Sequence, residues 1–195
     1  MRTTSVLLVG VGGQGTILAG DVLAKVAAAA GLDVKLSEVH GMSQRGGSVD
    51  TMVRFGERVF SPVVSSGEVD HLVAFEITEA ARWLAYLRPG GRLLVDPRMI
   101  APLPVLTGAL PAPAGLEAAL EAEGALFVDA GKIACRAGSP RSANVVLLGA
   151  LSVGLPFSAS VWREVIAARV PPKTVDANLA AFELGRRAAG EGGAA

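Results

Sequence analysis

A glycine-rich loop with one hydrogen-bonding side chain stands near the start of the sequence. Gly10, Gly12 and Gly15 satisfy the pattern G-x-G-x-x-G, with Gly13 and Gln14 between them. The loop comes between an apolar run and a helical stretch, the context in which such a loop binds phosphates. Glycines let a ligand approach the backbone, and the N–H groups that open a helix attract an anion. Two other interpretations stay open: the glycines only allow close packing of helix on strand, or the loop faces a partner protein.

A second polar segment, residues 37–48, begins at the carboxyl end of the predicted strand Val34–Val39. Binding sites of open α/β sheets lie beyond the carboxyl ends of strands, so this segment and the glycine loop (residues 10–15) are expected to face one crevice. Its side chains suit an anionic or amide group, or they form a polar loop shaped by hydrogen bonds. His40 has no evident nucleophile beside it. The candidate ligand- or partner-facing residues of this segment are Glu38, Gly41, Ser43, Gln44, Arg45, Gly46 and Gly47.

Two further polar residues are candidates for the site. Glu76 comes after the predicted strand His71–Phe75, and Asn144 opens a predicted helix. Glu38 and Glu76 at one sheet edge would suit general acid–base chemistry, and Glu38 alone would suit a ribose hydroxyl. The simpler expectation is that Glu76 caps the helix after it and that Asn144 is an N-cap or an interface residue.

The residues that several kinds of chemistry require are absent from the sequence. The sequence contains no nucleophile elbow, no P-loop and no metal-ligand spacing, so we assign no catalytic residue and no metal site. Cys135 is the single cysteine, is expected to be buried, and cannot hold an iron–sulfur cluster, which needs about four thiolates. The net charge of zero argues against a nucleic-acid partner, and no apolar run is long enough to span a bilayer. We therefore expect a cytoplasmic protein.

The elements that position these residues alternate between strand and helix. The sequence predicts strands at 6–11, 34–39, 49–55, 58–60, 71–75, 92–96 and 125–129, and helices at 16–30, 79–87, 116–123, 143–153, 160–170 and 173–187. Gly31 is expected to stop the first helix, Pro89-Gly90-Gly91 the second, and the proline-rich stretch 101–114 to form a loop or edge strand. This alternation indicates an α/β protein with a doubly wound, mostly parallel, Rossmann-like sheet and helices on both faces. We expect one domain over residues 1–188 and a flexible tail over 189–195.

Several sequence runs together resemble a known family. LLVGVGGQG, SEVHGMSQRGGSV and FEITEAARWLAYLRPGG resemble the gamma-type domain of 2-oxoacid:ferredoxin (acceptor) oxidoreductases, and AGSPRSANVVLLGALS and PPKTVDANLAAFELG are similar to its C-terminal half. The resemblance covers roughly residues 5–185. The motif HGMSQRGG favours the indolepyruvate branch over the gamma subunits of the pyruvate and 2-oxoglutarate enzymes.

The resemblance implies a division of labour between subunits. Such enzymes decarboxylate a 2-oxo acid oxidatively to an acyl-CoA and pass the electrons to ferredoxin. Thiamine diphosphate and the [4Fe–4S] clusters are expected on a large alpha subunit. This chain would assemble with that subunit, complete its substrate or CoA region, and be inactive alone. A stand-alone NAD(P)-binding protein and a purely structural interaction module are the alternatives that the glycine loop leaves open.

Overall fold

The core of the fold is a mixed six-stranded sheet. The computed structural model describes residues 2–40 and 47–192. Its strands are β1 (Thr4–Val11), β2 (Asp33–His40), β3 (Ser48–Gly56), β4 (Val69–Ala74), β5 (Leu87–Val95) and β6 (Leu126–Phe127), in the spatial order β2-β3-β1-β4-β5-β6. β1, β4, β5 and β6 are mutually parallel, whereas β3 runs antiparallel to both of its neighbours. The predicted α/β class with a mostly parallel sheet is confirmed.

Strand β3 changes the expected arrangement of the first crossover. In a Rossmann unit β2 lies directly beside β1. Here β3 pairs with both, for example Val11 with Ser48 and His40 with Val49, so β2 is displaced to the edge of the sheet. The strand predicted at residues 58–60 is not found, and β3 pairs with β2 and β1 instead.

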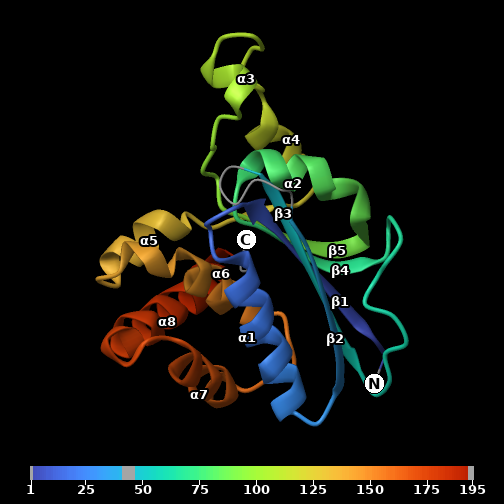
Figure 1. The fold of residues 1–195 in the computed structure, drawn as a ribbon, viewed down its shortest axis with the longest axis vertical. Helices are drawn as coiled ribbons and strands as arrows, with labels where there is room; N and C mark the ends of the chain where they lie inside the picture. Colours follow the sequence, from blue (N-terminus) through green and yellow to red (C-terminus); the bar gives the residue numbers. More distant parts are fainter. Residues whose placement is uncertain (1, 41–46, 193–195) are drawn as a thin grey trace.

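Helices cover both faces of the sheet (Figure 1). One face carries α1 (Thr16–Ala29), α5 (Ala130–Arg136), α6 (Ala143–Ser152), α7 (Ala159–Arg169) and α8 (Val175–Gly192), and the other carries α2 (Ile77–Trp83) and α4 (Leu116–Ala122). Single 3-10 turns occur at Leu84–Tyr86, Pro140–Ser142 and Pro172–Thr174. Side chains of β1 alternate between the two cores: Val6 and Leu8 pack on the α1 face, Leu7 and Val9 on the α2 face. Burial on both faces explains why this strand is continuously apolar.

Helix α6 is buried along almost its whole length and packs closely against α8. A Cβ at Gly149 would lie 2.1 Å from the carbonyl oxygen of Phe182, and one at Gly185 would lie 2.0 Å from that of Val146. Both positions therefore require glycine, because a side chain would separate the helices. Phe182, buried on α8, stacks on the equally buried Trp162 of α7 with 5.9 Å between ring centroids.

Three further expectations are corrected. Pro89-Gly90-Gly91 does not follow a helix end directly but lies inside β5, at a register shift between the Val69–Leu87 and His71–Arg92 pairs. Helix α5 was not expected, and it follows directly on the predicted strand 125–129, of which the structure keeps only Leu126–Phe127 as β6. Helix α8 runs to Gly192 and buries Ala189, so residues 189–192 are helical where the sequence predicts a tail.

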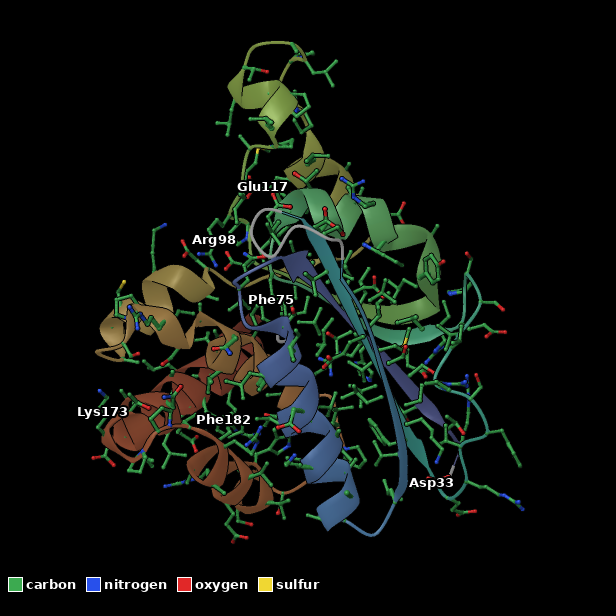
Figure 2. The ribbon with its side chains drawn as sticks, viewed as in Figure 1. Asp33, Phe75, Arg98, Glu117, Lys173 and Phe182 are labelled. Carbon is green, nitrogen blue, oxygen red and sulfur yellow. The ribbon has the colours of Figure 1, made fainter. Side chains whose placement is uncertain are left out.

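The segment 99–116, which we call the arm, projects from the α2 side of the sheet (Figure 1). It contains the short helix α3 (Leu103–Leu106) and no charged residue. Leu103 and Leu106 are each 71% exposed. Figure 2 shows Arg98 and Glu117, the charged residues that flank it, at its base. The arm is thus an apolar projection, and the charged residues nearest to it in the sequence lie at its base.

Candidate functional site

The glycine loop is closed on itself by Gln14. The Oε1 atom accepts a hydrogen bond from the backbone N–H of Val11 at 2.6 Å, and Nε2 donates to the carbonyl of Phe75 at 2.7 Å. A Cβ at Gly10 would lie 2.7 Å from this Oε1 and 3.0 Å from the Cβ of Phe75. Packing therefore accounts for glycine at position 10, and Gln14 ties the carboxyl end of β1 to that of β4.

Gly15 joins the loop to α1 and contacts α6. It adopts a left-handed conformation with φ 82°, which favours glycine. Asn144 donates from Nδ2 to the carbonyl of Gly15 at 3.3 Å and accepts from the N–H of Val145 at 3.0 Å. A Cβ at Gly15 would lie 2.6 Å from that Nδ2. Asn144 is not the N-cap of α6, which is Ser142; its side chain instead holds α6 against the start of α1.

The outer surface of the loop is formed by Gly12 and Gly13. Gly13 has φ 97° and no neighbour within 4 Å of a built Cβ, so it faces open space. Gly12 donates its N–H to the carbonyl of Gly47 at 2.9 Å. The end of the β2–β3 connection therefore meets the glycine loop, as expected from the sequence. Gly41, Ser43, Gln44, Arg45 and Gly46 lie outside the described residues.

Glu38 does not join this group. It is exposed on β2 and opposite Thr51 of β3, so a whole strand separates it from β1. Glu76 follows β4, which lies on the far side of β1 from β2 and β3. The arrangement of Glu38 and Glu76 as an acid–base pair is therefore not found.

Glu76 is the buried N-cap of α2 and the anchor of the arm. Its Oε2 accepts from the N–H of Glu79 at 2.9 Å, and its Oε1 accepts from the N–H of Ile100 at 3.0 Å. The N–H of Ile77 also donates to the carbonyl of Arg98 at 3.1 Å. The expected cap is confirmed, and the same carboxylate fixes where the arm leaves the sheet.

Further carboxylates gather at this edge, and the sequence reading missed them. Glu79 accepts from Ser48 Oγ at 2.5 Å and from Arg82 Nε at 3.1 Å. Asp50 lies on β3, where burial first and the neighbouring Glu79 second raise its pKa.

Asp96 and Asp129 follow β5 and β6 in the same way that Glu76 follows β4. Arg98 donates to Asp96 from its backbone N–H at 3.1 Å and from Nη2 at 3.2 Å, yet burial outweighs this pairing and raises the pKa of Asp96. Asp129 caps α5, and its bond to Lys132 lowers its pKa. Applying the carboxyl-end rule to every predicted strand would have found both residues.

The assembled edge is a set of positioned hydrogen-bonding groups. Glu76, Glu79, Asp96 and Asp129 each accept from an N–H, a hydroxyl or a cation of this chain. Across residues 2–40 and 47–192, no group of three or more His, Cys, Asp or Glu side chains is arranged to hold a metal ion. Cys135 is exposed on α5, contrary to expectation. Among the helices of the described residues, none combines the length and apolarity needed to cross a membrane.

Comparisons with known proteins match nearly the whole chain. The family described as pyruvate ferredoxin/flavodoxin oxidoreductase matches residues 5–188. Indolepyruvate oxidoreductase subunit IorB of Thermococcus kodakarensis is 43% identical over 198 residues, which cover 98% of each chain.

Solved structures show the same fold. The gamma subunit of a keto/oxoacid ferredoxin oxidoreductase from Geobacter sulfurreducens PCA has a TM-score of 0.71 and 27% identity, over 96% of this chain and 99% of that one. The 2-oxoglutarate:ferredoxin oxidoreductase from Magnetococcus marinus has a TM-score of 0.76 and 25% identity over 98% of this chain but only 32% of its own. The fold therefore occurs both as a separate subunit and within a longer chain. With its motifs, its sheet and these matches in agreement, the chain belongs to the pyruvate ferredoxin/flavodoxin oxidoreductase family.

Proposed function

We propose that this chain is the small, non-catalytic subunit of a cytoplasmic indolepyruvate ferredoxin oxidoreductase. The complex would decarboxylate an arylpyruvate oxidatively, form the acyl-CoA and pass the electrons to ferredoxin. The observation that carries the proposal is the end-to-end match to subunit IorB, which covers 98% of both chains.

The redox centres are assigned to a large alpha subunit. A [4Fe–4S] cluster takes about four thiolates, and this chain has one cysteine. The clusters would therefore be bound by the partner, which also delivers electrons to ferredoxin, and we assign thiamine diphosphate to the same partner from the family resemblance. The charged groups at the carboxyl edge of this chain are used in caps and ion pairs, which suits a positioning role.

The glycine loop and the β2–β3 connection would form this chain's side of the shared site. Gly13 faces open space, and Gly12 is held to Gly47, so backbone groups lie at the surface where a ligand or a partner can approach. This surface is proposed to border the substrate or CoA region. Gln14 gives it a fixed shape, because it links two strand ends from within.

The arm is proposed to be covered by the large subunit. An exposed, charge-free projection is unusual on a free monomer, whereas the cores of subunit interfaces are poor in charge. Its base is fixed by Glu76 at the carboxyl edge, so the same partner would cover the arm and the glycine loop.

The NAD(P) alternative fits the geometry less well. A Rossmann site needs the acidic residue on the strand beside β1, and here β3 separates them. Two strand spacings amount to about 9.5 Å. Glu38 therefore lies too far out to bind the ribose of a nucleotide seated at the glycine loop.

Co-purification and reconstitution test the proposal. The tagged chain should retain a large iron–sulfur subunit from its native cells, and only the complex should reduce ferredoxin with indolepyruvate, CoA and thiamine diphosphate. Leu103→Asp with Leu106→Asp should weaken assembly, whereas the exposed Glu121→Ala on α4 should not.

Three results would count against the proposal. Turnover by the isolated chain would contradict its non-catalytic role, and preference of the complex for pyruvate or 2-oxoglutarate would move it to another branch of the family. Micromolar binding of NAD(H) in a calorimetric titration would favour the stand-alone alternative.

A further inference from the structure

A cavity of about 260 Å³ lies between the strands β4, β5 and β6 on one side and helix α6 on the other. It is bounded by His71 of β4, Arg92 and Leu94 of β5, Leu126 at the start of β6, and Ala150 and Leu151 of α6. The cavity exists because β6 is short: it pairs with Leu94 and Val95 only, so the part of β5 toward Arg92 has no outer neighbour under α6. A gap between sheet and helix results.

Two basic side chains meet at this gap. His71 and Arg92 are paired residues of adjacent parallel strands and point to the face covered by α6. His71 is 9% exposed and has no hydrogen-bond partner among the described residues. In the same part of the chain no carboxylate pairs with Arg92, whose guanidinium lies against Gly154 just beyond α6. The site thus holds an unpaired cation beside an unpaired, buried imidazole.

Burial and the cations around His71 keep its ring neutral at physiological pH. Burial first, and then Arg92, lower its pKa to about 4. Arg88 acts in the same direction and Asp70 in the opposite one, while Asp70 is itself paired with Arg88 at 2.7 Å. Helix α6, which forms the other wall, carries no charged residue. A neutral imidazole retains one N–H donor, so both polar groups can donate to the same acceptor.

From this juxtaposition we propose that the cavity binds a small organic acid, with its carboxylate between Arg92 and His71 and its apolar body against Leu94, Leu126 and Leu151. A carboxylate accepts charge-assisted hydrogen bonds from a guanidinium and takes a second bond from an imidazole N–H. The walls beyond these two groups are aliphatic, which suits a ring or a branched chain. The volume is slightly below the roughly 300 Å³ at which ligand pockets begin, so the ligand has about one ring. The site is separate from the proposed subunit function and does not depend on it.

NMR titration of the full chain with phenylacetate tests the site. Phenylacetate should produce saturable shifts at His71, Gly91 and Ala150, and it should raise the pKa of His71 because a bound anion favours the imidazolium. Arg92→Gln should weaken binding about tenfold or more, which corresponds to about 1.4 kcal/mol for the lost charge-assisted bond. Arg88→Gln, on the same strand but paired with Asp70, is the matched control and should leave binding unchanged.

Phenylacetamide and inorganic phosphate separate the two parts of the ligand. The amide has the ring without the charge and the phosphate has the charge without the ring, so both should bind more weakly than phenylacetate. This comparison needs no variant and therefore cannot fail through misfolding.

Four outcomes would overturn the proposal. The first is that binding does not saturate up to about 10 mM phenylacetate, above the range of about 1 mM that is typical of weak ligands. The second is that phenylacetamide binds as tightly as phenylacetate, and the third is that the Arg88 and Arg92 variants lose the same affinity for phenylacetate. The fourth is that phenylacetate no longer binds once the chain is assembled with its partner subunit. The last result would show that a partner subunit fills the cavity.

Discussion

Replacing Gln14 by alanine tests whether one side chain holds the glycine loop. The change leaves the N–H of Val11 and the carbonyl of Phe75 without their partners, at residues that are 8% and 2% exposed. Each buried group left unsatisfied costs about 1–3 kcal/mol, and water entering beside the loop recovers part of this. We expect the free energy of unfolding to fall by about 2–4 kcal/mol. The melting temperature should fall by about 2–4 °C for each kcal/mol in a chain of this size.

Gln14→Glu separates the acceptor from the donor. The introduced carboxyl still accepts from Val11, but it donates to Phe75 only when it is protonated. Its pKa in the folded state should therefore be raised above the unfolded value of about 4.3. The stability it contributes is fully present below about pH 4.3 and is lost as the pH rises through the folded-state pKa. At pH 7 this variant should be no more stable than Gln14→Ala.

Urea unfolding at pH 7, followed by circular dichroism, measures these effects. Lys25→Ala is the control, because it removes an exposed ion pair with Asp21 on α1 and should cost less than about 1 kcal/mol. A Gln14→Ala variant within about 0.5 kcal/mol of the natural chain would refute the reasoning, since the loop would then hold its shape without the two bonds.

Three other substitutions address the caps, the cavity and the loop. His71 has a pKa of about 4 in the folded chain and an ordinary value of 6.5, so the stability it contributes is present above pH 6.5 and is lost as the pH falls toward 4. Between pH 7.5 and 4.5 the free energy of unfolding of the natural chain should fall by about 2.5 kcal/mol through this residue, and urea unfolding of His71→Gln should lack that fall. Glu76→Ala leaves the N–H groups of Glu79 and Ile100 without acceptors and should cost about 1–3 kcal/mol, with faster amide exchange at Ile100 as the specific sign that the arm has loosened. Gly15→Ala should lower the free energy of unfolding by more than the roughly 1 kcal/mol of backbone strain, because the new Cβ also clashes with Asn144. In a double-mutant cycle with Asn144→Ala, the double variant should lose less free energy of unfolding than the two single variants lose together. Additive losses would show that the two residues do not interact.

The sequence correctly predicted the elements that depend only on the residues within them. The strand β1, the glycine loop and helix α1 follow from an apolar run, a set of glycines and an alanine-rich stretch, and Gly31 ends α1 with φ 78° as expected. The position of β3 could not be predicted in this way. Strand order depends on pairing between distant segments, and no local pattern in residues 48–56 shows that this strand enters between β1 and β2.

The Pro89-Gly90-Gly91 segment shows how tertiary context overrides a stop signal. Between the pairs Val69–Leu87 and His71–Arg92, β5 has four intervening residues where β4 has one. The surplus bulges outward, which accommodates a proline and two glycines without breaking the strand on either side. The sequence signal for an irregularity was sound, but it marked a bulge within a strand.

In the candidate site, too, residue types could be predicted from the sequence, but contacts between distant segments could not. The polar residues of the glycine loop could be recognised by type, whereas their partners could not. Gln14 bonds to Phe75 and Asn144 bonds to Gly15, and both contacts join segments far apart in the chain. Glu79 was missed because its role depends on Ser48, which only the fold brings beside α2.

The close packing of α6 and α8 has a consequence for the order in which this protein is made. The core on the α1 face joins Val6 and Leu23, from the first part of the chain, to Phe182 and Ala189 near its end. A ribosome adds about 5–20 residues per second, so this apolar face waits on the order of ten seconds or more for the helices that cover it. Folding of that face is therefore completed only after α8 has been synthesised, and a chain truncated before α8 would expose a surface suited to chaperones and aggregation. The close contacts at Gly149 and Gly185 thus make the packing of α8 against α6 the step that completes this core.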